Sequence, residues 1–173
     1  MTANYWESSQ FQRFMLTRSE LADAERLHSM RLTRHETVFL KIYFAGVIQK
    51  LGKRLRIRQE IIATALVYFK RFYLNNTFYD IDPYLMAATS AYLACKVEEN
   101  PHHIKYICNE TKAALADVSP AIKFPYDVAD IAECESYLLE EMKFYLVVYH
   151  PYQVLIDINE QAKLPKPSLQ AAW

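Results

Sequence analysis

The fold is decided by residues 57–74, which read IRQEIIATALVYFKRFYL. Apolar side chains recur there every three to four residues and would form two adjacent stripes along a helix. The first stripe contains Ile57, Ile61, Ala65, Tyr68 and Phe72, and the second contains Ile62, Leu66, Phe69 and Tyr73. A helix that is apolar over so much of its circumference must be surrounded by other helices. This segment therefore predicts the central helix of an all-α domain.

Helix-start signals occur on both sides of that segment. Thr33 and Glu36 have the spacing of a capping box, and Gly52 is well placed to end the resulting helix in a left-handed conformation. Further along, Asp82 followed by Pro83 is typical of an N-cap and a first helical residue. These signals predict one helix before the central helix and one after it.

Further patterns, weaker over 104–116 and strong over 126–142, extend the helical body. Apolar spacing predicts helices over 104–116 and 126–142, which gives about five helices between Thr33 and Met142. Residues 144–149 are partly β-branched and favour an extended segment, and a short helix pattern begins at Tyr152. At the N-terminus, a short helix around Phe11 precedes a polar stretch.

Composition excludes several classes of protein. The 173 residues carry no net charge and include only two glycines, which disfavours an all-β fold and glycine-rich phosphate loops. Nucleic-acid binding usually needs a basic excess, so we expect no direct nucleic-acid contact and interpret the basic run at 53–58 as surface.

Cysteine usage and the polar N-terminus indicate a protein of a reducing compartment. Cys95, Cys108 and Cys134 are odd in number and contain no CxxC pair, so we expect buried free thiols. No signal peptide or membrane-spanning apolar run is recognisable. We therefore expect a soluble intracellular protein without a membrane contact.

A search for catalytic or metal-binding patterns favours neither. There is no HExxH, GxSxG, P-loop or dinucleotide fingerprint in the sequence. His102, His103 and Cys108 could be combined into a metal site, but adjacent residues point in different directions and a fourth ligand is missing. We expect no catalytic residue, no cofactor and no metal.

Two ionisable residues stand out on otherwise apolar helices. Lys96 follows the run AYLAC near the end of its predicted helix, and Glu135 lies among Ile131, Cys134 and Leu138. One interpretation is that Lys96 is favoured by the helix dipole and extends to water. The other is that both side chains meet at a shared surface and offer charge-assisted hydrogen bonds to a partner's backbone.

Several motifs together resemble one family. They are YWESS at 5–9, RQEIIATALVYFKRFY at 58–73, LACKVEE at 93–99, CESYLL at 134–139 and VYHPY at 148–152. In these motifs the chain resembles the cyclins, and especially the C-type cyclins of the Mediator kinase module. The resemblance covers essentially the whole chain and implies five-helix cyclin boxes.

The resemblance implies a regulatory rather than a catalytic function. In cyclins, residues at the positions of Lys96 and Glu135 hold the backbone around the C-helix of a cyclin-dependent kinase, and so favour the active arrangement of the kinase. Glu98 and Glu99 would add an acidic patch to this kinase-binding surface. The implied setting is the nucleus, where the kinase module regulates transcription by RNA polymerase II.

Trp6 and Glu98 are the positions where the resemblance suggests docking of a further subunit of the Mediator kinase module. For Trp6 an equally weighted alternative is that its ring simply fixes the N-terminal helix to the box.

The resemblance also divides the chain. It predicts an N-terminal helical segment at 1–30, a first cyclin box at 31–147 and the start of an incomplete second box at 148–173. Two alternatives to an activating cyclin stay open. One is a shortened form that binds a kinase without activating it, and the other is a core repeat like that of the general transcription factor TFIIB.

Overall fold

The computed structural model describes residues 4–29, 31–163 and 165–172. Within these ranges the chain is all-helical and no residue lies in a β-strand, as the sequence predicts. The elements are η1 (Tyr5–Glu7), α1 (Ser9–Phe14), α2 (Arg18–Ser29), α3 (Arg34–Leu55), α4 (Gln59–Asn75), α5 (Pro83–Val97), α6 (Ile104–Val118), α7 (Val128–Glu141), α8 (Tyr152–Ala162) and α9 (Lys166–Ala172).

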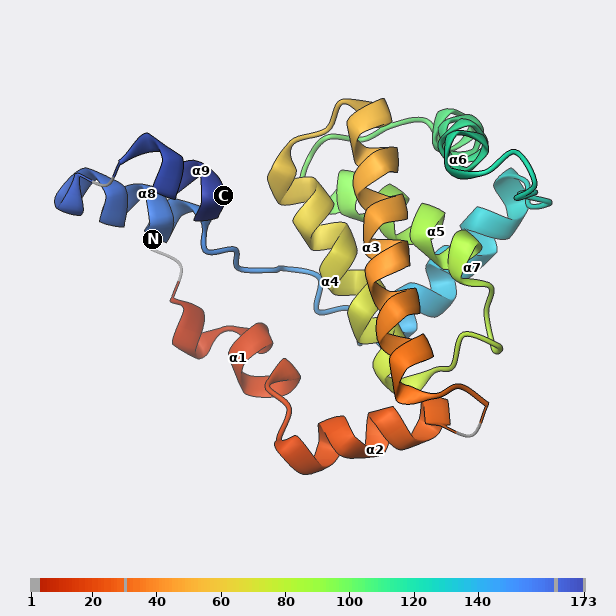
Figure 1. Ribbon diagram of the computed structural model, residues 1–173, viewed down its shortest axis with the longest axis horizontal. Helices are drawn as coiled ribbons and strands as arrows, with labels where there is room; N and C mark the ends of the chain where they lie inside the picture. Colours follow the sequence, from red (N-terminus) through yellow and green to blue (C-terminus); the bar gives the residue numbers. More distant parts are fainter. Residues whose placement is uncertain (1–3, 30, 164, 173) are drawn as a thin grey trace.

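Helices α3 to α7 form one bundle, which we call the body (Figure 1). The prediction that α4 is the central helix is wrong, because α5 is the helix that contacts all four others. Its small residues Ala87, Ala88, Ala91 and Ala94 are buried and let the neighbouring helices approach closely. Apolar periodicity could not reveal this, since the bulky stripes of α4 signal burial more strongly than alanines do.

Two of the predicted helix starts are confirmed. The Thr33 hydroxyl accepts a hydrogen bond from the Glu36 amide at 3.3 Å, and the Glu36 carboxylate accepts one from the Thr33 amide at 2.8 Å. At the start of α5, the Asp82 carboxylate accepts a hydrogen bond from the Tyr84 amide at 2.7 Å. Both caps satisfy backbone donors that would otherwise lack partners.

The predicted end of α3 at Gly52 is wrong. Helix α3 continues to Leu55, and Arg56 is the left-handed residue that follows, with φ of 55°. Gly52 is instead buried inside the helix, where an added Cβ would lie 2.5 Å from Cγ1 of Ile62. The glycine is therefore needed for the close approach of α3 and α4, not for a turn.

The segments outside the body are also largely helical. The polar stretch before residue 30, within the predicted N-terminal helical segment, forms α2, and the C-terminal residues form α9, a helix that was not predicted. Helix α2 is fixed to the body by His28, whose Nε2 lies 2.8 Å from the carbonyl oxygen of Tyr73. Residues 145–150, which we call the strap, are extended and lead to α8 and α9, which stand away from the body (Figure 1).

The three cysteines are buried and free, as predicted. Burial raises the pKa of Cys95 to about 11 and also raises the pKa of Cys134. Both thiols are therefore protonated and unreactive at neutral pH. In the described part of the chain, no helix is long and apolar enough to cross a membrane.

Candidate partner-binding site

The structure brings Lys96 and Glu135 together at the surface of the body. Lys96 is in the last turn of α5, Glu135 is in the middle of α7, and Lys96 Nζ lies 2.6 Å from Glu135 Oε1. The Lys96 side chain is 43% exposed and also lies over the ring of Tyr92. Donation to Glu135 raises the pKa of Lys96, so its ammonium stays charged.

This ion pair keeps unused hydrogen-bonding capacity. The Lys96 ammonium has two further N–H donors, and the second oxygen of Glu135 can accept. A polypeptide laid across the pair could therefore donate an amide to Glu135 and offer a carbonyl to Lys96 without breaking the bond between them. This geometry agrees with the interpretation that Lys96 and Glu135 meet at a shared surface.

The backbone at the end of α5 is capped by local hydrogen bonds. The Asn100 amide donates to the Cys95 carbonyl at 2.9 Å, and Glu99 adopts a left-handed conformation with φ of 53°. This is a Schellman motif, which satisfies the last carbonyls of the helix. It leaves Glu99 exposed three residues after Lys96, and the acidic patch expected at Glu98 and Glu99 stays a prediction.

Glu98 is more deeply engaged than the sequence suggests. Its Oε1 accepts a hydrogen bond from the Thr64 hydroxyl at 2.6 Å, and that hydroxyl lies 2.7 Å from Nε2 of His150. Because a hydroxyl has one proton, Thr64 donates to Glu98 and must accept from a protonated Nε2 of His150. One oxygen of Glu98 is thus committed inside the chain, and the side chain is half-buried. Sequence reasoning missed Thr64 and His150, which are 86 residues apart.

Trp6 is 67% exposed, and its ring packs edge-on against Tyr5 and Phe11 of its own N-terminal segment. Tyr5, not Trp6, reaches the strap through an edge contact with Tyr149. The anchoring interpretation therefore fits Tyr5 better than Trp6. The docking interpretation of Trp6 stays a prediction.

Two of the three residues considered for a metal site, His103 and Cys108, are engaged in other contacts. His103 Nδ1 accepts a hydrogen bond from the Lys105 amide at the start of α6, and the Cys108 thiol lies 3.8 Å from the Tyr126 carbonyl. Among the described residues, no group of three or more His, Cys, Asp or Glu side chains is arranged to hold a metal ion.

Comparison with known proteins places the chain in a family. The model of the cyclin N-terminal domain matches residues 12–147. The chain belongs to the cyclin family. The all-α fold and the resemblance found in the sequence are thereby confirmed. The division at residues 30 and 147 stays a prediction, and residues 1–3, 30, 164 and 173 of the predicted segments lie outside the described residues.

Individual relatives match over the whole chain. It is 38% identical to the RNA polymerase II holoenzyme cyclin-like subunit of Emericella nidulans, covering 58% of that protein. It is also 38% identical to the subunit of the same name from Yarrowia lipolytica, with 65% covered, and to Cyclin-C of Drosophila melanogaster, with 66% covered. The chain thus spans less than two thirds of the length of these curated relatives.

Solved structures show the same fold. A chain of the yeast TFIIK (Kin28/Ccl1/Tfb3) complex superimposes with a TM-score of 0.70 at 27% identity, covering 93% of this chain and 66% of that one. A chain of the CAK complex of Chaetomium thermophilum bound to ATP-gamma-S gives a TM-score of 0.68 at 25% identity, covering 94% and 54%.

Proposed function

We propose that this chain is a regulatory cyclin that binds and activates a cyclin-dependent kinase of the Mediator kinase module. Its kinase-binding surface is the Lys96–Glu135 pair with Glu99 and the exposed side of Glu98. Through this kinase it regulates transcription by RNA polymerase II in the nucleus. Further subunits of the module dock around Trp6 and Glu98.

The observation that carries the proposal is the Lys96–Glu135 pair at the surface where α5 meets α7, with the Lys96 side chain 43% and the Glu135 side chain 14% exposed. An ion pair that water can reach contributes little to stability, typically about 0–1 kcal/mol at a protein surface. Its free donors and acceptor instead suit the backbone of a foreign helix end. The names of the fungal relatives place them with RNA polymerase II, and the superimposed chains come from the TFIIK and CAK complexes.

Activation follows from differential binding. As a regulatory subunit, the chain raises kinase activity by binding the active arrangement of the kinase more tightly than the inactive one. Gripping the end of the kinase C-helix does this, because the position of that helix controls the ion pair that holds the ATP phosphates.

The direct test is co-purification with a Mediator-type cyclin-dependent kinase. Lys96→Ala combined with Glu135→Ala should abolish the complex while the helical circular dichroism of the chain stays near normal. The matched control is Arg54→Ala with Glu110→Ala, which removes an ion pair of 2.9 Å between α3 and α6. Kinase capture that survives the first double substitution, or is lost equally in the second, contradicts the assignment of the site.

A second candidate function is binding without activation, and it is favoured by the exposure of α8. Val154 and Ile158 on that helix are 58% and 48% exposed, so this end of the chain lacks the packing of the body. An in vitro kinase assay distinguishes the two functions. Adding the chain to free kinase raises activity if it activates, whereas a non-activating form lowers the activity given by a longer cyclin of the same type.

A further inference from the structure

One face of α4 carries three polar side chains, Thr64, Tyr68 and Arg71, spaced so that they line up toward the strap and α1. Thr64 is bonded to Glu98 and His150, and the Tyr68 hydroxyl donates to the carbonyl of Leu146 in the strap. Both are fully satisfied within the chain. Arg71 is the exception on this face.

Arg71 is a buried cation whose guanidinium has no carboxylate or hydrogen-bond partner among the described residues. Its residue is 9% exposed, and its Nη1 atom is fully buried with no acceptor in the described part of the chain. None of the ion pairs or hydrogen bonds between described residues involves Arg71. The guanidinium lies instead 3.9 Å from the ring centre of Phe14 at the end of α1. A guanidinium cannot escape this cost by losing its proton, so burial without a counter-charge is unfavourable.

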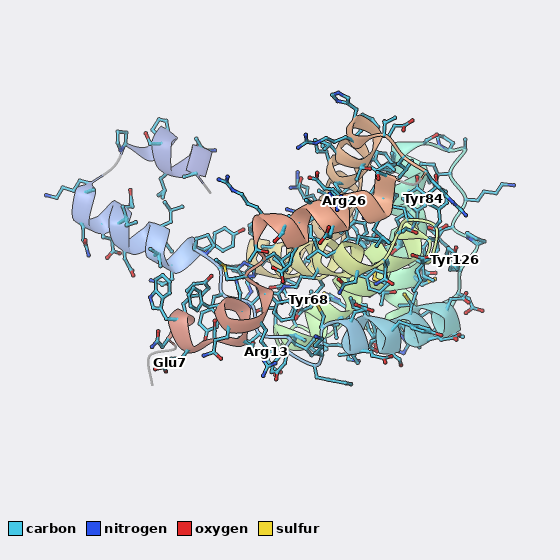
Figure 2. All side chains as sticks on the ribbon, turned by 90° about the horizontal axis from the view of Figure 1, so that it is seen from below. Glu7, Arg13, Arg26, Tyr68, Tyr84 and Tyr126 are labelled. Atoms are coloured by element: carbon cyan, nitrogen blue, oxygen red, sulfur yellow. The ribbon has the colours of Figure 1, made fainter. Side chains whose placement is uncertain are left out.

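A second cation, Arg13, also contacts an aromatic ring. Arg13 precedes Phe14 and places its guanidinium 4.9 Å from the ring centre of Tyr145 in the strap, again without a carboxylate partner among the described residues. Figure 2 shows Arg13 at the end of α1 and Tyr68 on the body helix that α1 approaches. Two cations without a carboxylate partner among the described residues therefore contact aromatic rings where α1 meets the strap, Arg71 at Phe14 and Arg13 at Tyr145.

The cover over Arg71 is weakly attached. Helix α1 has six residues, none of them buried, and it packs mainly against η1 rather than against the body. Apart from ring contacts, its tie to the strap is the side chain of Gln10, which bonds the amide and carbonyl of Tyr149. Phe14 can therefore move aside without disturbing the packing of the body.

We propose that Arg71 is an anion-binding residue that receives a carboxylate from an acidic segment of a partner polypeptide. Phe14 is the movable cover, and Arg13 is the outer cation that attracts the segment. A carboxylate fits the planar guanidinium in a bidentate manner. The aromatic surroundings of Phe14, Tyr68 and Tyr145 suit the apolar stem of a glutamate better than they suit a strongly hydrated inorganic anion. This site is separate from the Lys96–Glu135 pair, so it stands or falls independently of the proposed kinase contact.

The test uses the full chain and a fluorescein-labelled peptide of six glutamates, with a six-glutamine peptide as the uncharged probe. We expect the glutamate peptide alone to bind, and Arg71→Met to weaken it about tenfold or more, as expected for the loss of one charge-assisted pair. Arg26→Met is the matched control, since Arg26 is exposed and already paired with Asp23, and it should leave the affinity unchanged.

Two further measurements separate a binding role from a structural one. Arg71→Met should leave the melting temperature of the free chain unchanged or raise it, because it removes an uncompensated charge. Phe14→Ala should strengthen peptide binding several-fold by removing the cover. Equal binding of both peptides, an unchanged affinity in Arg71→Met, a lowered melting temperature in that variant, or complete displacement by equimolar inorganic phosphate would each overturn the proposal.

Discussion

Helix α5 places ten of its fifteen residues in the interior of the body, whereas α1 and α8 bury none of theirs. The body is held by apolar burial around small side chains. The flanking segments are held by individual polar and aromatic contacts: His28 for α2, Gln10 for α1, and Thr64 with Tyr68 for the strap. The body can therefore present the Lys96–Glu135 pair in a fixed geometry, while the flanks can shift without unfolding it. The expected effects of substitutions differ accordingly.

The largest effect is expected where two body helices touch. Gly52→Ala should destabilise the chain by up to about 3 kcal/mol, because the added methyl group collides with buried Ile62. Gly46→Ala is the matched control on the same helix, since nothing lies within 4 Å of an added Cβ there. It should instead stabilise by about 0.5–1 kcal/mol through helix propensity. Urea unfolding monitored by circular dichroism measures both, and equal effects would contradict the close approach of α3 and α4.

A smaller loss is expected where the body meets the strap. Thr64→Val keeps the shape but leaves Glu98 and His150 without their shared hydroxyl, so we expect a cost of about 1–2 kcal/mol. Thr111→Val is the control, because that buried hydroxyl bonds only the Ile107 carbonyl in its own helix. Equal free energies of unfolding for the two variants would show that the bridge between the body and the strap contributes nothing.

The same bridge predicts a pH dependence. Burial lowers the pKa of His150, and the nearby carboxylates of Glu98 and Glu60 only partly oppose this. An unfolded histidine titrates near about 6.5, so the unfolded state binds more protons below that pH and stability falls as the pH decreases through this range. His150→Gln should flatten the slope, whereas substitution of exposed His35 should not. Unfolding midpoints between pH 7.5 and pH 5 provide the measurement.

The smallest effect on global stability is expected in the flank itself. Gln10→Ala removes the bond of 2.7 Å from the Tyr149 amide, but α1 contributes no buried residue, so the free energy of unfolding should change by less than about 0.5 kcal/mol. Hydrogen exchange at the Tyr149 amide should nevertheless become faster. Exposed Gln12 on the same helix is the control and should leave that exchange rate unchanged.

Local signals predicted much of the body. The Thr33–Glu36 and Asp82–Pro83 starts follow from short-range chemistry, and Lys96 and Glu135 stood out because charges on apolar helices need a partner. The predictions that were wrong concern features set by packing between residues far apart in the sequence. Gly52 serves the approach of a neighbouring helix, and α5 is central because of alanines that carry no strong apolar signal. The bounds of α2 within the predicted N-terminal helical segment could not be predicted, because its polar sequence shows no apolar stripe.

The lack of a carboxylate partner for Arg71 among the described residues could not be predicted at all. Its sequence neighbours on α4 give no hint that Phe14, 57 residues earlier, would cover its guanidinium in place of a carboxylate. The bridge from Glu98 through Thr64 to His150 is invisible for the same reason, because its three members lie in segments that meet only in the folded chain.

Because the thiols of Cys95, Cys108 and Cys134 are buried, their reaction with a thiol reagent would report transient opening of the bundle. In the native state an alkylating reagent reaches them only when the bundle opens, so the labelling rate counts opening events directly. A single cysteine introduced at the surface would react selectively beside them. Site-specific dyes could then be attached without first deleting any native sulfur.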